Sequence, residues 1–361
     1  MISLRDAFTL FVLASSALAT PAMAQSEPLG LNALSAYNLI VLGDLTSSSE
    51  VEGRTFVGGN LTGNSSNYEI ASSVPASTYT VPGLTVVGNV TGGTKNLDNG
   101  SGAIVGGNVS SGFNLNGAAQ TVDVGGTISN TNVNQNTVVS GLANSNPAFV
   151  QNLTQYGSAM GTSMTGLSYQ LGTLAGTASV VMNGSTGVFN VPSGSTTPTV
   201  FNLTASQLAG MSAIQFNTDG SSMVVVNVTG ASVALAQNFL GGTNNLGQSV
   251  IWNFPNATSL SLTTAWGGSV LAPLAAATTG NYIQGSAVFG SLTQNGEMHI
   301  GTFSTSFGLP STSSSSSTSS TSSSGSSSGA DVVPEPGMIA LFAAGAAGLA
   351  WRRRRASLKP A

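Results

Sequence analysis

Short apolar runs interrupted by glycine recur along the first third of the chain. The four clearest copies occupy residues 56–61, 86–90, 104–109 and 122–128. The valines that precede their glycines are 30, 18 and 19 residues apart, and Ile251, Val270 and Val288 repeat the rhythm with separations of 19 and 18. Such a period of short strands and glycine turns is typical of one coil of a parallel β-solenoid, because each coil can bury its apolar side only against the next.

We therefore predict an all-β fold with one flanking α-helix, with a parallel β-solenoid (β-helix) over residues 25–310. The alternative is an antiparallel β-sandwich, which also has short strands and glycine-rich turns, about 8 to 12 residues apart. The 30-residue gap predicts one coil with a surface insertion around residues 64–78. Asn60, Asn89 and Asn108 take equivalent places, so we expect stacked amides that bond along the solenoid axis, in preference to ligand contacts.

One segment has helical periodicity instead. After Asn146 as the candidate N-cap and Pro147 at the first helical position, apolar residues follow at spacings of three and four. They are Phe149, Leu153, Tyr156, Met160, Met164, Leu167 and Leu171. We predict an amphipathic helix over 147–172 that packs against the sheet, since its internal glycines each cost about 1 kcal/mol relative to alanine. A helix beside coils that are distant in sequence is similar in layout to the ice-binding β-solenoids.

The start of the chain has the pattern of a secretory signal. Arg5, an apolar run over residues 7–19 and the small-residue site Ala22-Met23-Ala24 correspond to its three regions. We predict a signal peptide of residues 1–24, with cleavage between Ala24 and Gln25.

The end of the chain has a matching three-part pattern. Residues 311–332 are rich in serine and predict a flexible linker. In residues 333–361, a helix-breaking Pro-Glu-Pro segment and an apolar run over 338–351 precede an arginine block, which is expected on the cytoplasmic side of a membrane. The predicted signal residues are Val333, Pro334, Glu335, Pro336, Gly337, Arg352, Arg353, Arg354 and Arg355.

This arrangement resembles the PEP-CTERM sorting signal of Gram-negative bacteria. The resemblance implies an exosortase-type protease as the processing partner, with cleavage near the Pro-Glu-Pro motif. It also implies a short transmembrane segment as a transient or permanent single-pass anchor. The mature protein is then expected at the cell surface or in the extracellular matrix.

Composition narrows the range of partners. Between residues 25 and 330 there are nine acidic side chains and two basic ones, Arg54 and Lys95, for a formal net charge of −7. A surface with so few cations cannot supply the phosphate contacts that nucleic acid requires. The sequence contains no cysteine, which excludes disulfides and thiolate chemistry.

Candidate catalytic or metal-binding residues are few. His299 is the only histidine, and we expect a structural role for it at the edge of the last coil. Glu50 and Glu52 lie two residues apart and are expected on one face of a strand, an arrangement similar to the paired carboxylates of a glycosidase, but Arg54 on the same face indicates a charge-balanced strand. Calcium binding together with Asp44 is the alternative. We predict no catalytic, cofactor-binding or metal-binding residues.

A second resemblance covers residues 30–305, most specifically at the two ends of that range. It is carried by Tyr37-Asn38, Val41-Leu42-Gly43-Asp44, Val51-Glu52-Gly53-Arg54, Val57-Gly58-Gly59-Asn60, Gly268-Ser269-Val270-Leu271-Ala272-Pro273 and Gly296-Glu297-Met298-His299. These segments resemble the choice-of-anchor A domain of bacterial surface proteins. The resemblance implies an adhesive domain and brings no catalytic residues with it.

Together these patterns predict an exported, non-enzymatic surface or matrix protein that adheres to extracellular polysaccharide or another surface ligand through the repeated polar face of a solenoid. One alternative is an ice-binding solenoid, although Thr263-Thr264 and the other threonines show no regular Thr-x-Thr ladder at the coil period. The other is a polysaccharide-active enzyme using Glu50, Glu52 and Asp44.

Overall fold

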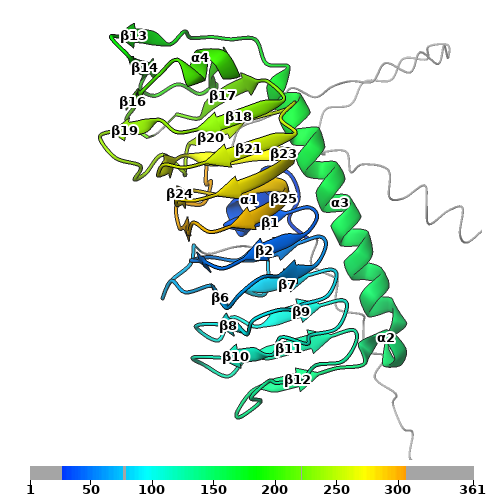
Figure 1. Cartoon of the computed structure of the whole chain (residues 1–361). Coiled ribbons are helices and arrows are strands. Elements are labelled where there is room, and N and C mark those ends of the chain that lie inside the picture. The colour runs from blue at the N-terminus through cyan, green and yellow to red at the C-terminus, as the bar shows by residue number, and fades with distance from the viewer. Residues whose placement is uncertain (1–26, 76–78, 221, 306–361) are drawn as a thin grey trace, which may run out of the picture. The chain divides into compact units, whose positions relative to one another are not determined.

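The computed structural model describes residues 27–75, 79–220 and 222–305, and in them the predicted parallel β-solenoid is confirmed (Figure 1). The predicted signal peptide, serine-rich linker and sorting segment lie outside the described residues. Among the helices that the structure describes, none combines the length and apolar character needed to cross a membrane.

The largest sheet shows how the chain is wound. Its main path runs β12-β11-β9-β7-β4-β1-β25-β23-β20-β17-β15, so the first strand of the chain lies in the middle of the stack. The N-terminal coils contribute β1 (Leu39–Val41), β4 (Thr55–Val57), β7 (Leu84–Val86), β9 (Ala103–Val105), β11 (Thr121–Val124) and β12 (Thr137–Val139). The C-terminal coils contribute β15 (Thr199–Thr204), β17 (Val224–Thr229), β20 (Val250–Asn253), β23 (Ser269–Thr279) and β25 (Ala287–Gln294).

Two further sheets complete the coils. A seven-stranded sheet has the order β10-β8-β6-β3-β26-β24-β22, and a four-stranded sheet the order β13-β14-β16-β19. The seven strands are β10 (Phe113–Leu115), β8 (Lys95–Leu97), β6 (Ser66–Tyr68), β3 (Glu50–Val51), β26 (Met298–His299), β24 (Ile283–Gln284) and β22 (Trp266–Gly267). The four strands are β13 (Val181–Asn183), β14 (Thr186–Asn190), β16 (Ala213–Asn217) and β19 (Asn238–Leu240).

The remaining strands form a third face of the stack. Here β2 (Leu45–Ser47) and β5 (Leu61–Thr62) continue the N-terminal coils, while β18 (Ser232–Leu235) and β21 (Ser259–Leu262) continue the C-terminal ones. They pair in parallel through the second halves of β23 and β25.

The long helix α3 (Pro147–Gly172) has the predicted bounds and connects the two ends of the stack. It runs beside the sheet from α2 (Leu142–Ser145), next to β12, toward the coils that contain β17 and β20 (Figure 1). The predicted apolar stripe faces the sheet: its residues from Leu153 to Leu171 are buried, and Phe149 is half-buried. Pro147 begins the helix as predicted, but the side chain of Asn146 makes no capping hydrogen bond.

Buried amides fix the C-terminal half of α3 to the sheet. Asn253 Nδ2 donates to Asn227 Oδ1 at 2.8 Å and to the carbonyl oxygen of Ser168 at 2.9 Å, while Asn227 Nδ2 donates to Asn202 Oδ1 at 2.9 Å. Ser168 Oγ donates back to Asn253 Oδ1 at 2.6 Å. Asn227 and Asn253 are buried, and Asn227 Nδ2 also donates to the Leu171 carbonyl at 2.9 Å, so the two amides set the register of the helix against two successive coils.

The first and last coils meet in the middle of the stack. Ile40 of β1 is paired with Phe56 on one side and with Val288 on the other. The fully buried Asn38 closes this seam, since its Nδ2 donates to the carbonyl oxygens of Gly285 at 2.7 Å and His299 at 3.0 Å. The seam is therefore held by contacts between residues almost 250 positions apart.

Smaller elements complete the described chain. They include the short helices α1 (Leu31–Ala36) and α4 (Ala205–Ala209), the latter opened by a capping box between Thr204 and Gln207. The predicted insertion over residues 64–78 is wrong in its first part, because Ser66 and Tyr68 are buried in β6 and belong to the coil. The insertion begins only after Tyr68.

Candidate functional site

The third face presents two regular columns of polar side chains, and we call it the polar face. Its central column is apolar and buried, and runs through Leu292, Leu45, Leu61, Val90 and Val109. On each rung, the residues before and after the central one point outward, because side chains alternate along a strand. Each coil therefore contributes one residue to each outer column.

The column before the central residue is an amide ladder, as predicted. Asp44 Oδ1 accepts from the backbone N–H of Asn60 at 2.7 Å, and Asn60 Oδ1 accepts from that of Asn89 at 2.9 Å. Asn89 Oδ1 then accepts from Asn108 at 2.8 Å, and Asn108 Oδ1 from Thr127 at 2.8 Å. Since each side chain is bound to the next coil, the three amides are held in one orientation within a ladder of five rungs.

The column after the central residue carries hydroxyl groups, and we call it the hydroxyl column. Parallel register places Thr278, Thr293, Thr46 and Thr62 side by side. Thr91 continues the line, and its Oγ1 donates to Thr62 Oγ1 at 3.2 Å. At the ends of the column, Ser261 pairs with Thr278, and Ser110 follows the bridged Val109. The threonines form one column only, since Asp44, Asn60, Asn89 and Ser291 stand two residues before them, and these rungs carry no Thr-x-Thr ladder, as expected.

The sequence signal for this column is a three-residue pattern. A polar residue, an apolar residue and then Thr or Ser recur at residues 44–46, 60–62, 89–91, 108–110, 127–129, 259–261 and 291–293. Unequal coil lengths, and the separation of the two halves in sequence, hide the common register of these triplets.

A groove runs between the two columns over the N-terminal coils. Its lining is Asp44, Thr46, Asn60, Thr62, Asn89, Thr91, Asn108, Ser110 and Thr127. With strands about 4.8 Å apart, five rungs give it a length of about 19 Å. Asp44, at one end, is the only charged residue of this lining.

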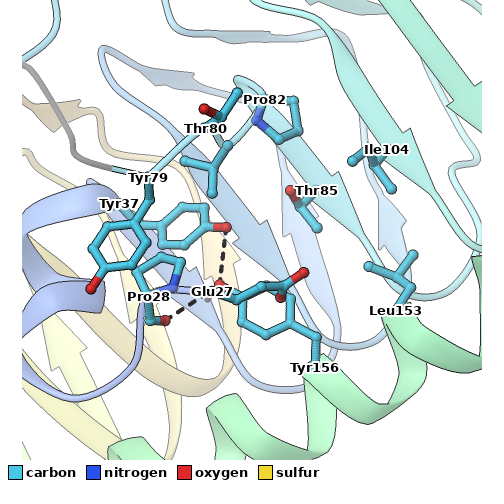
Figure 2. A pocket seen from close by; sticks show the side chains of 11 residues that line it. Glu27, Pro28, Tyr37, Tyr79, Thr80, Pro82, Thr85, Ile104, Leu153 and Tyr156 are labelled. Atoms are coloured by element: carbon cyan, nitrogen blue, oxygen red, sulfur yellow. Dashed lines mark hydrogen bonds between the residues drawn. The ribbon is translucent and has the colours of Figure 1, made fainter. Parts of the chain in front are cut away.

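A second hollow lies between α3 and the sheet and includes the first described residues (Figure 2). Its volume is about 100 Å³, well below the roughly 300 Å³ of ordinary small-molecule sites. The Tyr156 hydroxyl bonds to that of Tyr37 at 3.2 Å and to the Pro28 carbonyl at 3.4 Å. Partial burial raises the pKa of the Glu27 carboxyl to about 7. We interpret this hollow as a structural contact that holds residues 27–30 against the helix.

The predicted acidic candidates are distributed over different faces. Asp44 belongs to the amide ladder, whereas Glu50 Oε1 accepts from Asn67 Nδ2 at 2.6 Å on the seven-stranded sheet. Glu52 Oε2 accepts from the backbone N–H of Ile300 at 2.5 Å, and the Arg54 guanidinium donates to the Pro75 carbonyl at 3.3 Å. Each carboxylate is thus engaged in hydrogen bonding between coils, and the structure does not bring the three together.

His299 lies in the last coil, in β26, next to the seam. Its Nε2 is 2.7 Å from Glu297 Oε2, and its ring stacks on Tyr282 with centroids 4.3 Å apart. Within residues 27–75, 79–220 and 222–305, no group of three or more His, Cys, Asp or Glu side chains is placed to hold a metal ion.

Comparison with known proteins agrees with this geometry. A family described as "Putative Ice-binding-like adhesive domain" matches residues 30–300, and the PEP-CTERM protein-sorting motif matches residues 332–355. No curated protein and no solved structure matches the chain. The matches confirm an adhesive-type domain and the sorting motif, while the name choice-of-anchor A stays a prediction. Because the first match covers about three quarters of its length, the chain belongs to the ice-binding-like adhesive domain family.

Proposed function

We propose that this protein is exported, is processed at its C-terminal signal by an exosortase-type protease, and acts outside the cell as a non-enzymatic adhesin. The observation that carries the proposal is the polar face, whose two columns repeat amide and hydroxyl groups along the N-terminal coils. A repeated, rigid surface suits a repeated ligand, because many weak bonds add up only when their spacing matches. Extracellular polysaccharide is the ligand class we favour.

The sorting motif supports the first part of the proposal. Cleavage between Ala24 and Gln25, a membrane-held intermediate and a second cleavage near Pro336 are its expected steps. They are tested by intact-mass analysis and fractionation of the native host, comparing the wild type with a deletion of residues 334–336. We expect a mature chain that starts at Gln25 and leaves the inner membrane only in the wild type.

Adhesion itself is tested by attachment of host cells to surfaces and to their own matrix. Loss of attachment on deletion of the gene, and its restoration by the wild-type chain but not by the 334–336 deletion, would support surface adhesion. Unchanged attachment in the deletion strain would contradict it.

Ice binding is the second candidate, and the hydroxyl column specifically favours it. Thr278, Thr293, Thr46, Thr62 and Thr91 form one regular line of hydroxyl groups along the solenoid axis. Thermal hysteresis and ice-crystal shaping by the purified protein decide between the two candidates. Hysteresis in the wild type that disappears in a Thr46→Lys variant would favour ice binding. No hysteresis in the wild type would leave adhesion as the function.

A further inference from the structure

The groove on the polar face has a chemistry that selects one class of ligand. We infer that it binds an uncharged, linear polysaccharide lying parallel to the solenoid axis, across the coils from Asp44 to Thr127. This inference rests on the proposed adhesive function and names the ligand of the same surface.

The charge of the groove excludes polyanions. The lining carries one carboxylate, Asp44, and no cation, and the domain between residues 25 and 330 has a formal net charge of −7. An anionic polymer would therefore be repelled and would find no basic side chain to pair with in the groove. A polycation would find only Asp44, whereas Glu50, Glu52 and Glu69 lie elsewhere on the coils. A neutral polymer is not repelled and needs no oppositely charged side chain.

The polar groups of the groove match sugar hydroxyls. A primary amide and a hydroxyl each donate and accept hydrogen bonds, as the hydroxyl groups of a sugar do. In the ladder, Asn60 Nδ2 donates one hydrogen to Asp44 Oδ1 and Asn89 Nδ2 donates one to Asn60 Oδ1, both at 3.1 Å. The second hydrogen of each amide is available to a ligand. Because the ladder has already fixed these side chains, binding costs little conformational entropy.

The repeat of the groove explains why the ligand is linear and extended. Its rungs are about 4.8 Å apart, so a straight chain that follows the axis meets a polar side chain of the ladder at each rung, and an amide at the three central ones. A compact or heavily branched glycan would reach only one or two rungs. Since no aromatic ring lines the groove, affinity comes from repeated hydrogen bonds. We expect affinity to rise with chain length until the ligand covers about 19 Å, and then to level off.

The test is affinity electrophoresis of the mature protein purified from its host. Native gels contain mixed-linkage β-glucan, glucomannan or dextran as neutral polymers, alginate as the anionic polymer, or no polymer. We expect retardation by at least one neutral polymer and none by alginate. Retardation by none of the three neutral polymers, or equal retardation by alginate, overturns the inference.

A matched pair of variants locates the site. Thr62→Val with Thr91→Val removes two hydroxyls from the groove while keeping the shape and strand propensity of both side chains. Thr278→Val with Thr293→Val makes the same change in the same column, outside the groove. The groove pair should weaken binding about tenfold, as expected for two uncharged hydrogen bonds, and the control pair less than twofold. Equal effects of the two pairs would show that the groove is not the site.

Failure of the ligand assignment can be distinguished from failure of the adhesive function. If no neutral polymer is bound but host-cell attachment still depends on the gene, the adhesive function stands and the ligand class is wrong. If attachment does not depend on the gene, the adhesive function falls with it. Thermal melting of each variant, unchanged within about 2 °C, shows that any loss of binding does not come from unfolding.

Discussion

Asn38 is the side chain whose removal should most directly weaken the seam between the first and last coils. It is fully buried, and its Nδ2 donates to two backbone carbonyls of the last coil. Its Oδ1 accepts from the backbone N–H of Gly53, in the first coil, at 3.0 Å. One amide thus satisfies three backbone groups that belong to two sequence-distant parts of the chain.

The cost of replacing Asn38 with alanine follows from these bonds. The carbonyl oxygen of His299 keeps a hydrogen bond from Gly285 N, whereas the Gly53 N–H and the Gly285 carbonyl lose a partner in a dry environment. An unsatisfied buried group costs about 1 to 3 kcal/mol, so Asn38→Ala should lower the free energy of unfolding by about 3 kcal/mol. For a domain of this size the Tm should fall by about 6 to 10 °C.

The assay is thermal and urea denaturation followed by circular dichroism, with exposed Asn132→Ala as the matched control. Asn38→Asp adds a second comparison. Its carboxylate would face the carbonyls of Gly285 and His299 at neutral pH, and protonation, at a pKa that burial raises above the ordinary value, would restore a donor. The deficit of Asn38→Asp relative to the wild type should therefore shrink on acidification. An Asn38→Ala variant that melts within 1 °C of the wild type would refute the view that this amide stabilises the seam.

Three further predictions concern burial and backbone space. Burial lowers the pKa of Lys95 from 10.5 to about 8, so the unfolded chain binds more protons between these values. Relative to Lys95→Met, the wild type should therefore gain stability as the pH rises from 8 to 10. A difference in Tm between the two proteins that stays constant over this pH range would contradict the prediction. Partial desolvation beside the hollow raises the pKa of Glu27 from 4.5 to about 7, although the residue keeps an exposed edge. Wild-type stability should therefore fall as the pH rises between these values, relative to Glu27→Gln, as measured by the Tm in the same buffers. Gly161→Ala in α3 meets open space and should raise stability by about 1 kcal/mol. By contrast, a Cβ on Gly106 would lie 2.2 Å from a backbone carbonyl oxygen of the neighbouring coil. Gly106→Ala should therefore lower the Tm, and equal Tm values for the two glycine variants would be inconsistent with this packing.

The features predicted from sequence are those with local physical causes. Pro147 fixes the start of α3, and the three-and-four spacing of its apolar residues identifies the buried face. The amide ladder was predictable because Asn60, Asn89 and Asn108 follow the same glycine turn in coils of related sequence. In these places a local pattern and the final packing agree.

The features that were missed depend on contacts between distant segments. The hydroxyl column requires Thr46 to lie beside Thr293, and no local pattern shows that pairing. The second resemblance is least specific between its two ends, where strands such as β17 are buried on both faces and read as continuous apolar runs. The candidate acidic site failed for another reason: Asp44 lies on the polar face, while Glu50 and Glu52 bond to different neighbouring coils.

The winding of the chain also determines how it responds to tension. In a simple solenoid the terminal coils are edges, so a pulled chain end peels away one ladder at a time. Here the outermost strands of the largest sheet, β12 and β15, lie in the middle of the sequence, while β1 and β25 each pair on both sides. A force applied through either chain end must therefore break two ladders together. An adhesin built in this way resists shear at the points where it is loaded.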